Sequence, residues 1–305
     1  MNNADWQGKP YYSLDAWCKK AYGHKCKKIA LNAHMTCPNR DGSLGTRGCI
    51  FCSSGGSGDF AVDIESFPAV TNPQEEIPCT IAYFQAYTNT YAPLPYLEQV
   101  FSQALASPSV CGISIATRPD CLPAEVISLL VTLKNRFSGK FIWVELGLQT
   151  IHEATAAYIR RGYPLSCFEE CMQRLQTAEL PVIVHVILGL PGETKEHLLQ
   201  TIRYLNRFQI FGIKLQLLHI LKNTDLADDY CAGRFEVLSR DAYIDLLISC
   251  LEHLSPETVV HRLTGDGPKD LLIAPDWSRN KKDVLNTLHK KMRLESSYQG
   301  KTYGG

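Results

Sequence analysis

The sequence predicts an α/β protein built as a partial, TIM-like (β/α)6 barrel with a small C-terminal α/β extension. Short apolar segments rich in branched and aromatic residues recur along the 305 residues. Each is followed by a polar turn and then by a longer segment with helical periodicity. Near-continuous apolar strands of this kind are typical of a parallel sheet that is covered on both faces.

Six segments have strand character: residues 28–31, 80–84, 112–116, 141–146, 182–188 and 213–218. Six others have the apolar spacing of helices: residues 94–106, 123–135, 151–160, 166–179, 194–208 and 240–254. We place the barrel at residues 28–254, after an N-terminal helical segment at residues 1–27. Residues 255–305 form the extension, with one more strand and loop at residues 259–266 and a terminal helix at residues 281–292. In such barrels the chemistry lies on loops at the C-terminal ends of the strands.

The composition is that of an ordinary globular protein, and the formal net charge is zero. Lysine plus arginine equals aspartate plus glutamate, at 31 each, so no general basic field indicates nucleic acid. The first residues have neither the basic start nor the apolar run of a signal peptide. No stretch approaches the roughly 18 apolar residues that a membrane span requires. We therefore expect a cytoplasmic protein with no membrane partner.

Twelve cysteines are many for this length, and without a secretory signal they argue against a disulfide scaffold. Metal or redox chemistry is the leading explanation for some of them. Four others lie in or beside apolar runs and are expected to be small buried core residues: Cys79, Cys111, Cys121 and Cys250. Cys167 and Cys171 are four residues apart on a predicted helix, but no second pair accompanies them.

The loop after the first strand carries three cysteines, spaced by eleven and then two residues: Cys37, Cys49 and Cys52. Three thiolates can hold one [4Fe-4S] cluster and leave its fourth iron without a protein ligand. A bidentate ligand, such as the amino and carboxylate groups of methionine, can occupy that iron. Phe51 can cover the cluster or an adenine. The alternative is a structural zinc site, which needs a fourth ligand such as His34 or His24.

Further motifs follow the other strands: YFQAYTNTYAP, ATRPDCLP, ELGLQT, GLPGET and HRLTGD. Together with CPNRDG at the start of the cysteine loop, they resemble those of the radical SAM (S-adenosylmethionine) superfamily. Within that superfamily the sequence is similar to the Elongator-catalytic-subunit-like branch, the YhcC-like radical SAM proteins. The likeness covers most of the chain.

The resemblance implies roles for individual residues around SAM. Gln149 and His185 match side chains that hydrogen-bond the ribose. Arg161 matches the arginine that grips the carboxylate, for which a planar guanidinium is suited. Gly189 begins the turn whose backbone receives the adenine.

Two positions depart from the family pattern. Residues 84–87 replace the usual glycine-rich triplet that binds the SAM amino group, and Ala116 stands where related barrels often carry glutamate. The amino contact therefore falls to Thr117, Arg118 or backbone carbonyls near Gln85.

The resemblance also implies a reaction and its partners. SAM is cleaved to methionine and a 5'-deoxyadenosyl radical with an electron from a reducing partner such as flavodoxin or ferredoxin. The Elongator-like branch implies tRNA modification, at the C5 side chain of the wobble uridine. Tyr87, Arg118 and Lys214 are the candidates for catalytic contact with the substrate. Three alternatives stay open: a radical SAM enzyme acting on a small-molecule metabolite, a non-catalytic Fe-S electron carrier, and a zinc-dependent RNA-binding module.

Overall fold

The computed structural model describes residues 6–71, 79–265 and 267–304. Eight strands form one sheet in the order β2-β1-β3-β4-β5-β6-β7-β9, and every neighbouring pair is parallel. The strands are β1 (Lys27–Asn32), β2 (Val62–Asp63), β3 (Thr80–Phe84), β4 (Val110–Thr117), β5 (Phe141–Gln149), β6 (Val182–Leu188), β7 (Gly212–Leu217) and β9 (Val259–Arg262). In the described part of the chain the curved sheet has two edges, β2 and β9, and so forms an open barrel.

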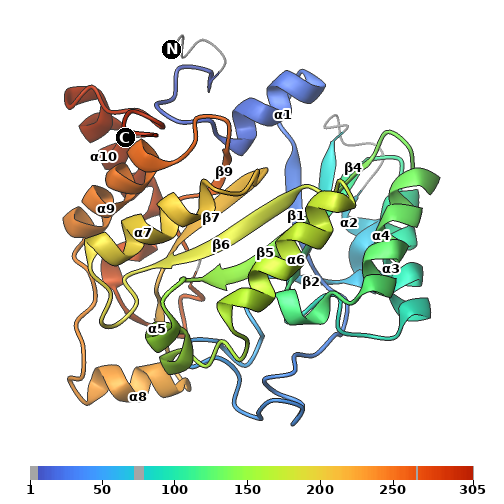
Figure 1. Ribbon diagram of the computed structural model, residues 1–305, viewed down its shortest axis with the longest axis horizontal. Helices are drawn as coiled ribbons and strands as arrows, with labels where there is room; N and C mark the ends of the chain where they lie inside the picture. Colours follow the sequence, from blue (N-terminus) through green and yellow to red (C-terminus); the bar gives the residue numbers. More distant parts are fainter. Residues whose placement is uncertain (1–5, 72–78, 266, 305) are drawn as a thin grey trace.

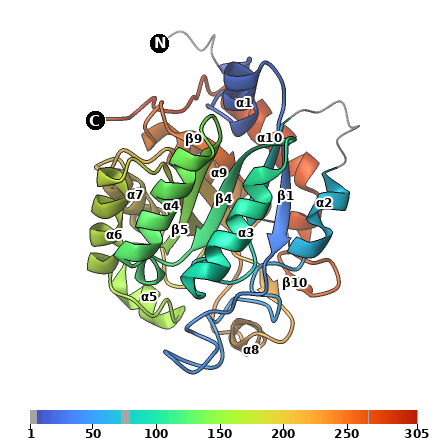
Figure 2. The same cartoon turned by 90° about the vertical axis from the view of Figure 1, so that its right-hand side faces the viewer.

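Helices cover the outer face of this sheet, as Figures 1 and 2 show for α3, α4, α6 and α7. The helices are α1 (Leu14–Tyr22), α2 (Phe67–Val70), α3 (Leu94–Ala106), α4 (Ala124–Arg136), α5 (Glu153–Tyr158), α6 (Leu165–Thr177), α7 (Lys195–Leu205), α8 (Asp225–Cys231), α9 (Arg240–His253) and α10 (Lys281–Leu294). Side-chain N-caps mark the start of several helices. At the start of α7, the Thr194 side chain accepts a hydrogen bond from the backbone N–H of His197. None of the helices that the structure describes is both long and apolar enough to cross a bilayer.

The predicted partial barrel is confirmed. All six predicted strands are present as β1, β3, β4, β5, β6 and β7, and the predicted helices between them end within a few residues of their expected bounds. The structure adds short elements that sequence analysis does not contain, including β2, α8 and an antiparallel pair of β8 (Ile220–Leu221) with β10 (Leu272–Ala274). Two- and three-residue strands show no periodicity, so a pattern search cannot find them.

The C-terminal segment takes part in the barrel. Its strand begins where predicted, but β9 ends at Arg262; residue 266, the end of the predicted strand and loop, lies outside the described residues. β9 pairs with β7, and α10 places Leu288 and Met292 in the main hydrophobic core. Strand pairing and core packing thus connect residues on the two sides of residue 255, and the predicted boundary there stays a prediction.

The interior of the barrel is layered from one end to the other. Alternate positions of β5 show the layers: Trp143 lies in an aromatic cluster, Glu145 in a buried polar layer, and Gly147 at a cavity. Trp17 of α1 packs edge-on against Trp143, with ring centroids 5.1 Å apart. The N-terminal ends of the strands are thus filled by apolar side chains, and the open space lies at the C-terminal ends.

A matched pair of leucines in α10 tests whether this helix belongs to the core. Leu288 is fully buried, whereas Leu294 is 76% exposed. Leu288→Ala should lower the free energy of unfolding by about 2–5 kcal/mol, because it removes buried methyl groups and leaves a cavity. Leu294→Ala should change it by less than about 0.5 kcal/mol. Urea unfolding of the full chain under reducing conditions measures both, and equal effects would contradict the packing of α10 described above.

Candidate active site

A cavity opens at the C-terminal ends of the barrel strands. Its walls combine the three cysteines of the loop after β1 with side chains from the ends of β3, β4, β5, β6 and β7. Figures 1 and 2 show this loop and α8 at the end of the barrel opposite α1. The structure therefore brings the predicted cluster thiols and the strand-end residues to one place, which is where parallel α/β barrels carry their chemistry.

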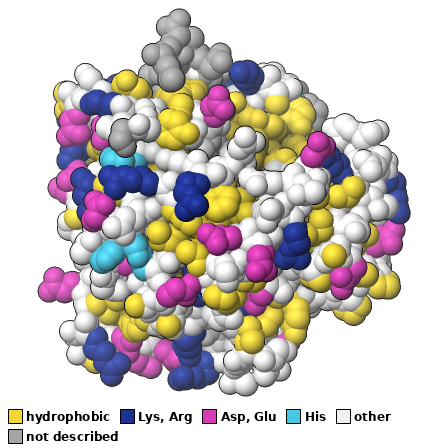
Figure 3. All heavy atoms as spheres, in the orientation of Figure 1, with side chains coloured by type: hydrophobic (Ala, Val, Ile, Leu, Met, Phe, Trp, Pro, Cys, Tyr) yellow, Lys and Arg dark blue, Asp and Glu magenta, His cyan; other side chains and the backbone are white. Residues whose placement is uncertain are grey.

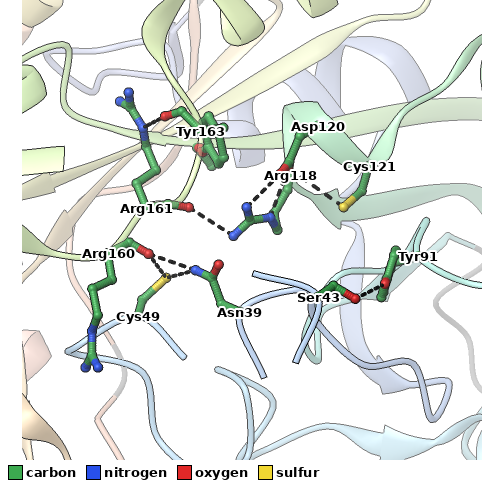
Figure 4. Close-up of polar contacts among 11 residues, drawn as sticks. Asn39, Ser43, Cys49, Tyr91, Arg118, Asp120, Cys121, Arg160, Arg161 and Tyr163 are labelled. Carbon is green, nitrogen blue, oxygen red and sulfur yellow. Dashed lines mark hydrogen bonds and ion pairs between the residues drawn. The ribbon is translucent and has the colours of Figure 1, made fainter. Parts of the chain in front are cut away.

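The cysteine loop is held in place by Asn39 and Arg40. The amide of Asn39 donates a hydrogen bond to the carbonyl oxygen of Arg160 (2.7 Å) and contacts the Cys49 sulfur at 3.4 Å, as Figure 4 shows. Arg40 donates to the carbonyl oxygens of Cys52 (3.0 Å) and Ser53 (2.5 Å). These contacts fix the loop before any metal binds.

The chemistry of the three thiols fits a [4Fe-4S] cluster better than one zinc ion. In the part of the chain that the structure describes, Cys37, Cys49 and Cys52 do not bring all three sulfurs within 4.8 Å of one another. One tetrahedral zinc, with Zn–S bonds of about 2.3 Å, would hold its sulfurs about 3.8 Å apart. A cubane binds each thiolate to a different iron and needs the wider spacing. Burial raises the pKa of the Cys49 thiol to about 12, so metal binding there must displace a proton.

Gln149 has the geometry expected of a ligand contact. It ends β5 with a φ of 67°, and its side-chain oxygen Oε1 is buried without a hydrogen-bond partner among the described residues. Gly147 leaves room beside it, since a Cβ at that position would lie 3.0 Å from Gln149 Nε2. Buried polar atoms are normally satisfied, so this oxygen is an acceptor for a hydroxyl that a ligand such as a ribose would bring.

His185 lies on β6 and also lines the cavity. Its Nε2 is 2.7 Å from Glu145 Oε2, and burial lowers the pKa of its imidazole to about 4. The ring is therefore neutral near pH 7. Because a carboxylate only accepts hydrogen bonds, Nε2 carries the proton and Nδ1 remains an acceptor.

Glu145 is fully buried and organises the polar layer below the cavity. Lys28 donates to its Oε1 (2.6 Å), Ser114 also donates to Oε1 (2.5 Å), and Lys214 pairs with Oε2. Burial alone would disfavour the charged carboxylate, but the nearby ammonium groups of Lys214 and Lys28 hold the pKa of Glu145 well below its ordinary value. The carboxylate is therefore ionised and orients His185.

Lys214, predicted to contact the substrate, lies beneath the cavity, and its contact with substrate stays a prediction. Its side chain is 3% exposed and lies in this polar layer, where it also donates to the Tyr83 hydroxyl (2.9 Å). It is not among the described residues that line the cavity. The ammonium neutralises Glu145, because a buried carboxylate needs a counter-charge.

Arg161 and Arg118 lie on either side of the buried Tyr163 ring, with guanidinium carbons 4.9 and 5.0 Å from its centroid. Figure 4 shows Arg161 turned toward the Tyr163 carbonyl, to which Nε donates (3.0 Å). Its other nitrogens bind the Thr150 carbonyl (2.7 Å) and the Glu153 carboxylate (3.2 Å). All three guanidinium nitrogens thus have protein partners. Arg161 also lines the cavity, and its grip on the SAM carboxylate stays a prediction.

Arg118 is likewise committed to the protein. It forms a two-point ion pair with Asp120 (2.9 and 2.7 Å) and donates to the Arg161 carbonyl (3.0 Å). It borders the cavity. The contacts place Arg118 as a residue that positions the 160–163 turn, while direct contact with SAM or substrate stays a prediction.

The remaining predicted residues surround the same cavity with one exception. Phe51, Gln85 and Tyr87 line it. Gln85 and Tyr87 also hold the loop after Cys52. The Gln85 amide donates a hydrogen bond to the Ser57 carbonyl (2.6 Å), and the Tyr87 hydroxyl donates one to the Ser54 carbonyl (2.6 Å). Gly189 has a φ of 85° but is not among the described lining residues.

Glu145 and Tyr163 are two cavity residues for which the sequence predicts no role. A glutamate inside the apolar strand segment 141–149 is itself a signal, since carboxylates are almost never fully buried unless paired. Tyr163 carries no such signal. Its hydroxyl donates to the Gly147 carbonyl, a contact that depends on the course of the chain between β5 and α6.

Removing the Glu145 charge tests the polar layer. Glu145→Gln should lower the free energy of unfolding at pH 7 by about 3–5 kcal/mol, because it leaves Lys28 and Lys214 without their counter-charge. Since the folded-state pKa of Glu145 is lowered, its stabilisation is present above the unfolded-state pKa of about 4.3 and is lost as the pH falls below it. The difference between wild type and variant should therefore shrink in urea unfolding between pH 6 and pH 3. The exposed Glu257→Gln is the control, and a pH-independent difference would argue against an ionised Glu145.

Comparison with known proteins agrees with this geometry. The Radical SAM superfamily matches residues 45–205, and the Radical_SAM C-terminal domain matches residues 210–293. The uncharacterized protein YtqA of Bacillus subtilis (strain 168) is 43% identical over 303 residues, which cover 97% of this chain and 93% of YtqA. Protein YhcC of Escherichia coli (strain K12) is 34% identical over 289 residues, or 93% of each chain.

Among solved structures, Elp3 of the archaeon Methanocaldococcus infernus, with residues 1–46 deleted, superposes with a TM-score of 0.65 at 16% identity. The match covers 90% of this chain and spans 64% of that one, so it is a likeness of fold. The superfamily match over more than half of the chain, together with relatives at 43% and 34% identity, shows that the chain belongs to the radical SAM superfamily, whose cofactors are a [4Fe-4S] cluster and SAM.

Proposed function

We propose that this radical SAM enzyme cleaves SAM reductively to a 5'-deoxyadenosyl radical and uses it to modify the C5 side chain of the wobble uridine in tRNA. SAM cleavage is supported by one observation: the same cavity holds the three loop thiols and a buried Gln149 oxygen without a partner among the described residues. The choice of tRNA as substrate rests on the resemblance to the Elongator-like branch.

In this proposal Cys37, Cys49 and Cys52 would hold the cluster at the cavity that they line, and its fourth iron would have no protein ligand. When bound, the cluster supplies the electron that breaks the bond between the SAM sulfur and C5'. Gln149 Oε1 accepts a hydrogen bond from one ribose hydroxyl, and the neutral His185 accepts from another through Nδ1. The side chains thus position the ribose without changing their protonation states.

Other residues shape the space around the reacting carbon. Ile187 and Leu218 are buried apolar side chains of the cavity wall, and Phe51 packs against the same apolar cluster. They exclude water, which protects a radical from being quenched. The electron donor is of the flavodoxin or ferredoxin class and approaches at the cysteine loop, where Leu44 and Arg47 are exposed.

The cysteine content favours a reducing compartment for this reaction. All twelve cysteines are free thiols, and three of them must stay reduced to hold the cluster. We therefore place the enzyme in the cytoplasm, where its tRNA substrate is also found.

The surface bears on how a tRNA would bind. On the face shown in Figure 3, lysine and arginine side chains are interspersed with aspartate and glutamate. The tRNA would then bind mainly through one splayed nucleotide inside the cavity, and less through a broad basic surface. The base would stack on aromatic side chains such as Tyr87. The same interspersed charge favours the second candidate, a radical SAM enzyme with a small-molecule substrate.

The central test uses two cysteine variants. Cys49→Ala should lose the brown chromophore and the formation of 5'-deoxyadenosine from SAM after anaerobic reconstitution and dithionite reduction. Cys250→Ala, at a fully buried cysteine in the core, should keep both. A colourless wild-type protein that does not cleave SAM would contradict the proposed activity.

The substrate is tested separately with the active wild-type protein. If tRNA is the substrate, bulk tRNA should raise the rate of 5'-deoxyadenosine formation, and tRNA nucleosides from a deletion strain should differ at the wobble uridine by mass spectrometry. SAM cleavage that tRNA leaves unchanged, with unaltered nucleosides, would instead favour the small-molecule substrate.

Gln149 tests the ribose contact. Gln149→Ala should weaken SAM binding by roughly 1 kcal/mol, about five-fold in Kd, because one hydrogen bond is lost. The iron content should stay unchanged, since Gln149 holds no metal. Gln173→Ala, at an exposed position of α6, is the control. Equilibrium dialysis of the reconstituted proteins measures the affinity, and unchanged Kd for Gln149→Ala would remove this residue from the SAM site.

A further inference from the structure

Four cysteines meet at the end of the barrel opposite the cavity. Cys18 lies in α1, Cys26 directly precedes β1, Cys79 directly precedes β3, and Cys111 is the second residue of β4. The Tyr22 side chain interacts electrostatically with all four thiols, which shows that they share one neighbourhood. Figures 1 and 2 show α1 across this end of the sheet, away from the cysteine loop and α8.

The sulfurs are turned toward one another. Cys26 Sγ and Cys79 Sγ are 3.0 Å apart, and these two with Cys111 Sγ all lie within 4.8 Å of one another. Among the residues that the structure describes, they are the one group of three or more potential metal donors that is so close. The Cys18 thiol hydrogen-bonds the Cys26 thiol, although its sulfur is not within 4.8 Å of all three. In a four-thiolate site, Cys18 supplies the fourth sulfur by a small approach from α1.

This spacing distinguishes the group from the cluster loop. A tetrahedral ion with thiolates at about 2.3 Å holds its sulfurs about 3.8 Å apart. That value lies within the 4.8 Å that bounds the separations of the Cys26, Cys79 and Cys111 sulfurs. A cubane would spread its thiolates further, because each binds a different iron. Soft thiolate ligands in a tetrahedral set suit zinc among the common metal ions.

The surroundings suit a metal–thiolate group of negative charge. Cys18 and Cys79 are buried, whereas Cys26 and Cys111 are half-buried and leave an access route from solvent. Lys25 and Lys27 flank Cys26 in the sequence, and Lys140 interacts electrostatically with Cys111. Trp17 and Phe141 form part of an adjoining aromatic wall. These positive and apolar groups would balance the charge and limit the water around the ion.

We propose that Cys18, Cys26, Cys79 and Cys111 form a structural site for one zinc ion, independent of the iron-sulfur cluster. The ion fastens α1 to the starts of β1, β3 and β4 and closes the N-terminal end of the barrel. Zinc binds the thiolates, so each thiol that coordinates releases one proton. The hydrogen bond with the Cys111 thiol, together with burial, raises the pKa of Cys26 to about 11, and burial raises that of Cys79 to about 12, so zinc must displace these protons.

Metal analysis of the full chain, purified anaerobically with a reductant from zinc-supplemented cells, tests this site. Wild type should hold one zinc per chain in addition to the cluster iron. Cys26→Ser with Cys79→Ser should lower the zinc content at least ten-fold while the iron and chromophore remain. Cys167→Ser with Cys171→Ser, a matched pair in α6, should keep the zinc. Cys37→Ala with Cys49→Ala should lose the iron and keep the zinc, which separates this proposal from the proposed function.

A second measurement does not depend on the folding of the double serine variant. Cobalt added to zinc-free Cys37→Ala with Cys49→Ala protein should produce the sulfur-to-cobalt charge-transfer and d–d bands of a tetrahedral thiolate site, with proton release. Wild type without zinc and without these bands would overturn the proposal. So would copper or additional iron in place of zinc, or a Cys26–Cys79 disulfide found by mass spectrometry after alkylation under argon.

Discussion

A single buried carboxylate constrains the interior of this barrel. Glu145 has no exposed surface, and its charge is balanced by Lys28 from β1 and Lys214 from β7. Because both lysines reach it across the barrel interior, the charge connects strands on opposite sides of the open sheet. The same carboxylate accepts a hydrogen bond from His185 and so determines which imidazole nitrogen faces a ligand as acceptor. The polar layer therefore supports the shape of the barrel and the orientation of one residue at its mouth.

The layers on each side of Glu145 divide the barrel into two ends with different chemistry. Toward the C-terminal ends of the strands lie the cavity, the cysteine loop and the unpaired oxygen of Gln149. Toward the N-terminal ends, Trp143 and Trp17 fill the space, and a second group of thiols lies beside them. The two thiol groups differ in spacing: among the described residues only Cys26, Cys79 and Cys111 bring three sulfurs within 4.8 Å of one another. A single ion suits that spacing, and a cubane suits the wider one. An aromatic layer and a charged layer separate them.

Arg161 and Arg118 border the cavity, and both make several contacts with the protein itself. Family resemblance assigns Arg161 to the SAM carboxylate, a reasonable partner for an isolated guanidinium. In the folded chain its nitrogens bind carbonyl oxygens of the Thr150 and Tyr163 region and the Glu153 carboxylate. Arg118 is similarly engaged by Asp120 and by the Arg161 carbonyl. Together they contact the Tyr163 ring and the turn beside Cys49, and so they help to position the backbone at the edge of the cavity.

Local patterns were enough to predict the strands β1, β3, β4, β5, β6 and β7, the helices between them and the three thiols of one loop. Each is encoded by apolar periodicity or by spacing within about fifteen residues. Which distant side chains meet depends on the folded chain. Lys28, Glu145 and Lys214 lie in three separate strands, and the thiols of Cys18, Cys26, Cys79 and Cys111 come from four segments. Their convergence depends on strand order, register and the curvature of the sheet, which no short window of sequence specifies.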